Sequence, residues 1–138
     1  MAGIEHITRA FIKRGDRVLL AHKYGETNTF LPGGHIEFGE YSDEALSREL
    51  REELGVEAKV KDFMGVHEYQ FTHKDIHHHE VNFIYEADIK GEATSVESHL
   101  EFLWCSLDQL EEKNLLPGSL PSLIREYTRT KKIFHKIQ

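Results

Sequence analysis

The strongest constraint on this chain is a helical pattern of leucines and glutamates between residues 42 and 54. Its leucines recur every four residues, at Leu46, Leu50 and Leu54. At about 100° per residue they form one apolar stripe, which is typical of a helix packed against a core. A neighbouring face carries three carboxylates, those of Glu49, Glu52 and Glu53. The pattern predicts a helix from Ser42 to Leu54 that buries one side and gathers negative charge on another.

The clustered carboxylates need compensating positive charge. Like charges one helical turn apart destabilise a helix by roughly a few tenths of a kcal/mol, and by more when they are partly buried. A divalent cation would offset this repulsion, and Mg²⁺ favours carboxylate, water and phosphate oxygens over a closed cage of protein ligands. The alternative is a solvated helix face on which Arg48 and Arg51 pair with the glutamates. The helix alone leaves both interpretations open.

The residues around the helix favour the cation. The segment from Gly34 to Val56 resembles the Nudix box, Gly-x5-Glu-x7-Arg-Glu-U-x-Glu-Glu-x-Gly-U, in which U is a bulky aliphatic residue. Every fixed position is matched, by Gly34, Glu40, Arg48, Glu49, Glu52, Glu53 and Gly55. The preceding Leu31-Pro32-Gly33 is also similar to the usual lead-in of the family. The chain therefore resembles the small, MutT-like Nudix hydrolases.

This resemblance implies a metal site. Glu49, Glu52 and Glu53 would bind Mg²⁺ or Mn²⁺, with Glu52 and Glu53 as the principal ligands. The backbone carbonyl of Gly33 or Gly34 would add an oxygen from the turn. In the family a metal-activated water usually attacks phosphorus, and the cation also neutralises phosphate charge.

The resemblance also implies supporting roles for the other fixed residues. Arg48 is expected to orient the carboxylates through a bidentate pair with Glu40. Gly34 would permit the tight turn before the helix, and Gly55 would end the helix. Glu40, Arg48 and Gly55 would shape the site without binding the metal.

The general base of the reaction is less defined. In the family it is often a glutamate on the helix or in a later loop. Glu97 and Glu101, shortly before Trp104, are the candidates for a loop carboxylate that approaches the metal. Their positions in the sequence do not choose between them.

The order of predicted elements is similar to the α/β/α sandwich of the family, an α/β fold with a mixed central sheet, formed as one domain over residues 1–138. The first elements expected are a β-hairpin of residues 4–12 and 17–22 and a helix capped by Ser42 or Asp43. The later ones are strands at 57–71, 81–89 and 101–105, a loop at 72–78, a brief helix after Ser106 and a helix at 121–129. The tail from Lys131 to Gln138 is expected to be frayed or weakly docked.

Composition limits the partners and the location. The net charge is −7, which disfavours nucleic acid as a partner. No apolar run approaches the roughly 18 residues that cross a membrane, and the N-terminus lacks the layout of a signal peptide. With a single cysteine, Cys105, an internal disulfide is ruled out. We expect a cytoplasmic protein with a small nucleotide-like substrate, and a homodimer is possible.

Two functions remain in view. The first is Mg²⁺-dependent hydrolysis of the diphosphate linkage in a nucleoside diphosphate derivative, such as an oxidised nucleoside triphosphate, ADP-ribose or a nucleotide sugar. The second is a non-catalytic Nudix domain that binds a nucleotide as a sensor, although such domains typically lose box carboxylates.

No substrate-binding residue is assigned by the sequence. The aromatic residues that alternate between residues 69 and 85 are more typical of a core than of a base-stacking surface, although one could stack on a nucleobase: Tyr69, Phe71, Phe83 and Tyr85. His79 or Glu80 could line a substrate cleft. The run His77-His78-His79 has no partner at a typical zinc spacing, so a polar strand end is favoured over a zinc site.

Overall fold

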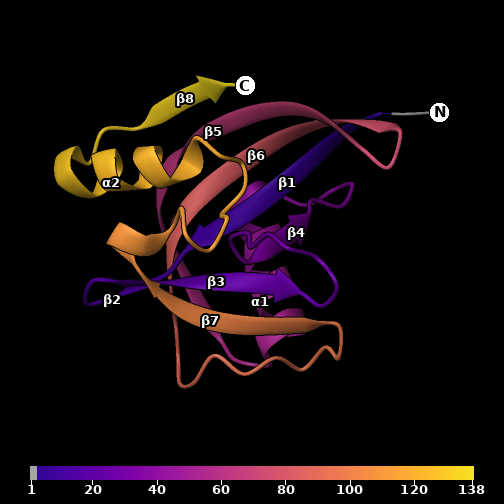
Figure 1. Ribbon diagram of the computed structural model, residues 1–138. Helices are drawn as coiled ribbons and strands as arrows, with labels where there is room; N and C mark the ends of the chain where they lie inside the picture. Colours follow the sequence, from indigo (N-terminus) through magenta and orange to yellow (C-terminus); the bar gives the residue numbers. More distant parts are fainter. Residues whose placement is uncertain (1–2) are drawn as a thin grey trace.

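The computed structural model describes residues 3–138, which form two sheets flanked by two α-helices (Figure 1). The strands are β1 (Ile4–Phe11), β2 (Lys13–Arg14), β3 (Arg17–Lys23), β4 (Gly33–His35), β5 (Ala58–His73), β6 (Ile76–Ile89), β7 (Leu100–Ser106) and β8 (Phe134–Ile137). The helices are α1 (Ser42–Leu54), the 3₁₀ turn η1 (Leu107–Gln109) and α2 (Leu120–Thr130).

The larger sheet is mixed, with the strand order β4-β1-β6-β5-β8. In it β1 runs antiparallel to β4 and parallel to β6, and β5 runs antiparallel to β6 and parallel to β8. The smaller sheet, β2-β3-β7, is antiparallel. The mixed sheet predicted from the sequence is therefore confirmed.

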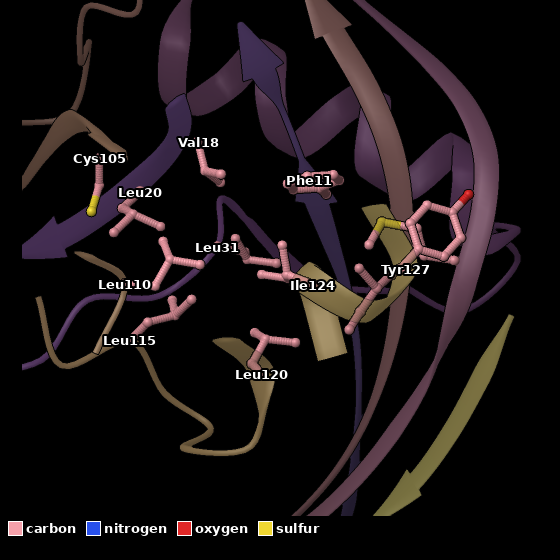
Figure 2. Packing of buried hydrophobic residues seen from close by; sticks show 12 residues of the cluster. Phe11, Val18, Leu20, Leu31, Cys105, Leu110, Leu115, Leu120, Ile124 and Tyr127 are labelled. Carbon is pink, nitrogen blue, oxygen red and sulfur yellow. The ribbon is translucent and has the colours of Figure 1, made fainter. Parts of the chain in front are cut away.

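Two apolar cores lie on opposite faces of β1, because successive side chains of a strand point to opposite sides. One core joins Ala10 and Ile12 to the leucine stripe of α1. The other joins Phe11 to residues of α2, among them Ile124 and Tyr127 (Figure 2). A helix thus covers each side, which is the layered α/β arrangement expected. The charged face of α1 is left free to build a site.

The predicted N-terminal hairpin is wrong in its pairing. Both strands exist, but β1 pairs with β4 and β6, whereas β3 pairs with β7 in the other sheet. Only the two-residue β2 folds back on β3. Since both edges of β1 are already hydrogen-bonded, β3 is directed into the second sheet.

The predicted loop at residues 72–78 is mostly strand. β5 and β6 pair as far as His73 and Ile76, and only Lys74 and Asp75 form the turn, with φ of 51° and 63°. The segment is polar because much of it is exposed at the end of a long ribbon, so its composition hid the strands.

The ends of α1 and of the chain also differ from expectation. The residue that caps α1 is Tyr41 rather than Ser42 or Asp43, and its backbone N–H donates to Glu44 Oε1 at 2.9 Å. The tail is not frayed, since β8 adds to the edge of β5. Gln138 N donates to the carbonyl of Glu68 at 2.9 Å. The pairing partner lies about seventy residues earlier, which local composition does not reveal. The last helix forms as expected, one residue longer at each end.

Candidate active site

The Gly33–Gly34 turn that the sequence predicted before α1 forms the start of strand β4, which pairs antiparallel with β1. Gly33 pairs with Arg9 and has φ of 146°. A Cβ added to Gly33 would be 2.0 Å from the carbonyl oxygen of Thr8. Only glycine fits there, which accounts for the glycine at this position of the predicted Gly-rich turn.

The same turn receives two carboxylates of α1. A Cβ added to Gly34 would be 2.5 Å from the carboxyl carbon of Glu49, so this side chain lies against the turn. The N–H of Gly33 donates to Glu53 Oε1 at 3.3 Å. Glu49 and Glu53 are one helical turn apart and therefore face the turn together.

A third carboxylate joins them from a later loop. A cavity of about 230 Å³ is lined by Lys23, Phe30, Gly33, Glu49, Glu53, Glu97, His99 and Leu100. The loop that carries Glu97 is fixed to the end of α1, because Val96 N donates to the carbonyl of Glu53 at 2.9 Å. We call this space the carboxylate cavity. It brings together three of the predicted site glutamates.

The carboxylate cavity disfavours isolated negative charge. Burial raises the pKa of Glu53 to about 8, although Arg9 opposes the shift. Burial also raises the pKa of Glu49, against the effect of Arg48. Carboxylates held in this way gain most from a cation placed among them.

Arg48 connects the helix to the loop before it. Its Nε and Nη2 donate to the two oxygens of Glu40 at 2.7 and 2.9 Å, and Nη2 also donates to the carbonyl of His35 at 3.0 Å. Nη1 donates to Glu49 Oε1 at 3.1 Å. This fork holds the pKa of Glu40 at about 2. The bidentate pair expected from the sequence is present.

Other predicted site residues lie outside the carboxylate cavity. Glu52 is exposed and accepts from Arg48 Nη1 at 3.3 Å. Glu101 pairs with His22 at 3.2 Å and does not line the carboxylate cavity. Gly55 ends α1 with φ of 66°, as expected, and donates to the carbonyl of Arg51.

The donor set fits a hard divalent cation. Glu49 and Glu53 offer carboxylate oxygens beside the backbone of the Gly33–Gly34 turn, and Mg²⁺ is bound by such oxygens. Across residues 3–138, no three His, Cys, Asp or Glu side chains are already arranged around one point. A cation here would therefore also take oxygens from water or from a phosphate, which is how Mg²⁺ usually binds.

A larger cavity of about 550 Å³ adjoins the carboxylate cavity, and Lys23 and Phe30 line both. Its floor is the face of β1, β6 and β5 that carries Glu5, Arg9, His67, Tyr69, Phe71, His78, Glu80, Asn82 and Ile84. We call it the sheet cavity. Pro117 and Leu120 form part of the opposite wall.

The aromatic residues divide between the two faces of the sheet. Phe71 stacks on Tyr69 and on His78, with ring centroids 4.7 and 4.8 Å apart, and all three line the sheet cavity. Tyr85 instead packs in the core beneath α1. The alternation His78, Glu80, Asn82 was a signal in the sequence that one polar face of this strand lines a cavity.

Arg9 is the main site residue that the sequence did not assign. It lines the sheet cavity, lies over the ring of Phe30 at 5.3 Å and donates to the carbonyl of Leu31 at 3.1 Å. Burial lowers its pKa, while nearby carboxylates, Glu80 first and Glu53 second, raise it. The histidine run holds no zinc-like arrangement: His78 pairs with Glu5 and His77 with Gln70.

The family follows from comparison with known proteins. The protein-family model described as the NUDIX domain matches residues 6–126 of this chain. The chain belongs to the Nudix family. It is 31% identical over 121 residues to the CTP pyrophosphohydrolase of Escherichia coli, covering 85% of this chain and 87% of that one. It is 31% identical over 126 residues to the ADP-ribose pyrophosphatase of Methanocaldococcus jannaschii, covering 87% and 70%.

Solved structures agree on the fold. The solution structure of the Escherichia coli ORF135 protein matches this Nudix hydrolase with a TM-score of 0.68 and 26% identity, over 95% of this chain and 94% of that one. The MutT protein of Bacillus halodurans matches with a TM-score of 0.76 and 23% identity, over 96% and 88%. Within residues 3–138, no helix is long and apolar enough to cross a membrane.

Proposed function

We propose that this Nudix hydrolase cleaves the diphosphate linkage of a nucleotide derivative with the help of Mg²⁺ or Mn²⁺. The observation that carries the proposal is the junction of the two cavities at Lys23 and Phe30. A carboxylate-lined cavity suits metal and phosphate, and an aromatic-lined cavity beside it suits a base and sugar.

The proposed cation ligands come from α1 and from the backbone before it. Glu49, Glu52 and Glu53, with a carbonyl of Gly33 or Gly34, would hold the cation. Bound there, the cation would neutralise phosphate charge and activate a water for attack at phosphorus. The proposal therefore adds Glu52 to Glu49 and Glu53, the two glutamates whose placement fits a cation.

Arg48 and Glu97 have different roles in the proposal. Arg48 donates to Glu49 and also to Glu40, so Arg48 is anchored by Glu40 and holds Glu49 in position. Glu97, which lines the carboxylate cavity, takes the proton from the attacking water. Glu101 lies away from this cavity, and its pair with His22 gives it a structural role.

The substrate is proposed at the level of a class. Relatives are named for CTP and for ADP-ribose, so a small nucleotide with a diphosphate linkage is the substrate we propose. Three expectations stay predictions: that the protein does not bind nucleic acid, that it forms a homodimer, and that it is located in the cytoplasm. A nucleotide sensor is disfavoured because every box carboxylate is retained.

A nucleotide panel with Mg²⁺ and Mn²⁺ tests the proposal, with release of the phosphate-containing products as the readout. Glu53→Gln and Glu52→Gln should each lower the rate by at least about 100-fold, because the bound metal lowers the activation barrier by several kcal/mol. Glu97→Gln should lower kcat by about 100-fold, whereas the matched change Glu101→Gln should have little effect. Wild-type inactivity on the whole panel would favour the sensor, and full activity of Glu53→Gln would overturn the metal site.

A further inference from the structure

Arg9 presents unused donors to the sheet cavity. A guanidinium has five N–H groups in a rigid fork. For Arg9 the structure records one hydrogen bond among residues 3–138, from Nη1 to the carbonyl of Leu31. The side chain is held in place by the ring of Phe30. Its other donors are therefore available to a ligand in the cavity.

Glu80 faces the same cavity but does not form an ion pair with Arg9. Of all carboxylates it most strongly raises the pKa of Arg9, yet the two form no ion pair within 4.0 Å in the described chain. Arg9 on β1 lies opposite Ile84 of β6, two positions beyond Asn82. Asn82 donates to Glu80 Oε1 at 3.2 Å, which fixes that carboxylate. A donor and an acceptor thus flank a gap on the floor of the cavity.

The charge of Glu80 determines which part of a nucleotide lies beside it. A carboxylate repels phosphate, so the phosphates belong at the other end, toward Gly33 and the carboxylate cavity. Glu80 would instead accept from a neutral N–H group. Nucleobases offer such a group where an exocyclic amine neighbours a ring nitrogen or a carbonyl, and that neighbour can accept from Arg9.

We propose that Arg9 and Glu80 form a base-reading pair that selects nucleotides whose base carries an exocyclic amino group. Cytosine places an amine where uracil has a carbonyl, and guanine carries an amine that hypoxanthine lacks. A carbonyl facing Glu80 would set lone pair against carboxylate, which opposes binding. This inference rests on the proposed function, because it assumes that the sheet cavity holds the base.

Calorimetric titration with two matched pairs, CMP against UMP and GMP against IMP, tests the pair without requiring turnover. At least one amino-bearing member should bind about 10-fold more tightly than its partner. Glu80→Gln should reduce that ratio to below about 3-fold, because an amide can donate to a carbonyl as well as accept. Asp88→Asn, an exposed change at the other end of β6, should leave it unchanged.

A second titration separates base reading from phosphate binding by Arg9. Arg9→Lys keeps the charge but loses the fork, so it should weaken CMP or GMP binding while binding of Mg²⁺-tripolyphosphate stays within about 2-fold. Equal binding within both nucleotide pairs, an unchanged ratio in folded Glu80→Gln, or a parallel loss of tripolyphosphate binding would overturn the proposal. Base selectivity in binding without hydrolysis on the panel would contradict the proposed function alone.

Discussion

The carboxylate cavity and the sheet cavity adjoin each other but are built in different ways. Glu49 and Glu53 come from one helix, and they lie against Gly34 and Gly33 respectively, which precede that helix by a short way in the sequence. The floor of the sheet cavity comes from β5 and β6, which are consecutive, and from β1, which lies far from them in the sequence. A short motif can therefore encode the first cavity, whereas the second depends on strand register. Changes at the first should act on the reaction, and changes at the second on substrate binding.

Among the changes that compare the two cavities, Gly34→Ala should have the largest effect. The added methyl would meet the carboxyl group of Glu49 and displace it. We expect kcat to fall by about 100-fold, because misplacing a reacting group by about 1 Å can cost that much. Gly118→Ala is the matched control, since nothing lies within 4 Å of its added Cβ. Steady-state kinetics of both variants would check this, and near-normal activity of Gly34→Ala would show that Glu49 does not need this contact.

Arg48→Lys should have the next largest effect. Lysine keeps the charge but cannot donate to both oxygens of Glu40 while also reaching Glu49. Loss of such a positioning residue typically lowers activity by about 10-fold or more. Arg51→Lys, an exposed change on the same helix, should be neutral. Equal kcat/KM for the two variants would remove Arg48 from its positioning role.

The two cavities also differ in how far the sequence predicted them. The resemblance carried by the box correctly predicted the Arg48–Glu40 pair. It did not separate Glu97 from Glu101, because that choice depends on a hydrogen bond between Val96 and the end of α1. Arg9 was left unassigned for the same kind of reason. Its role depends on the register of β1 between β4 and β6, and a single strand does not encode its partners.

The fold shows the same division. The sequence predicted α1, the mixed sheet and the last helix, since each depends on local periodicity or on the resemblance of the box. It misplaced the hairpin and missed β8. In both cases the pairing partner is distant in sequence, since β3 pairs with β7 and β8 pairs with β5. Which strand edge is free to accept a partner depends on the hydrogen bonds that the other strands have already formed.

Phe71→Leu should affect binding more than turnover. The leucine would remove the ring that stacks on Tyr69 and His78 at the end of the sheet cavity. We expect KM to rise by about 5-fold, which corresponds to a typical aromatic contact, while kcat stays within about 2-fold. Phe71→Tyr keeps the ring and should restore KM. A fall in kcat with constant KM would mean that the two cavities are not separate in function.

The smallest effect concerns acid stability. Glu40 has a pKa of about 2 in the folded protein, below its ordinary value of 4.5, because Arg48 stabilises the charged form. A lowered folded pKa stabilises the protein above pH 4.5, and this contribution is lost as the pH falls from 4.5 toward 2. Glu40→Gln should therefore lower the urea midpoint near pH 7, and the difference from wild type should shrink as the pH falls through that window. Phe71→Leu removes no charge, so its difference from wild type should stay constant with pH. If the difference in urea midpoint between Glu40→Gln and wild type is also constant with pH, the ion pair between Glu40 and Arg48 does not stabilise the folded protein.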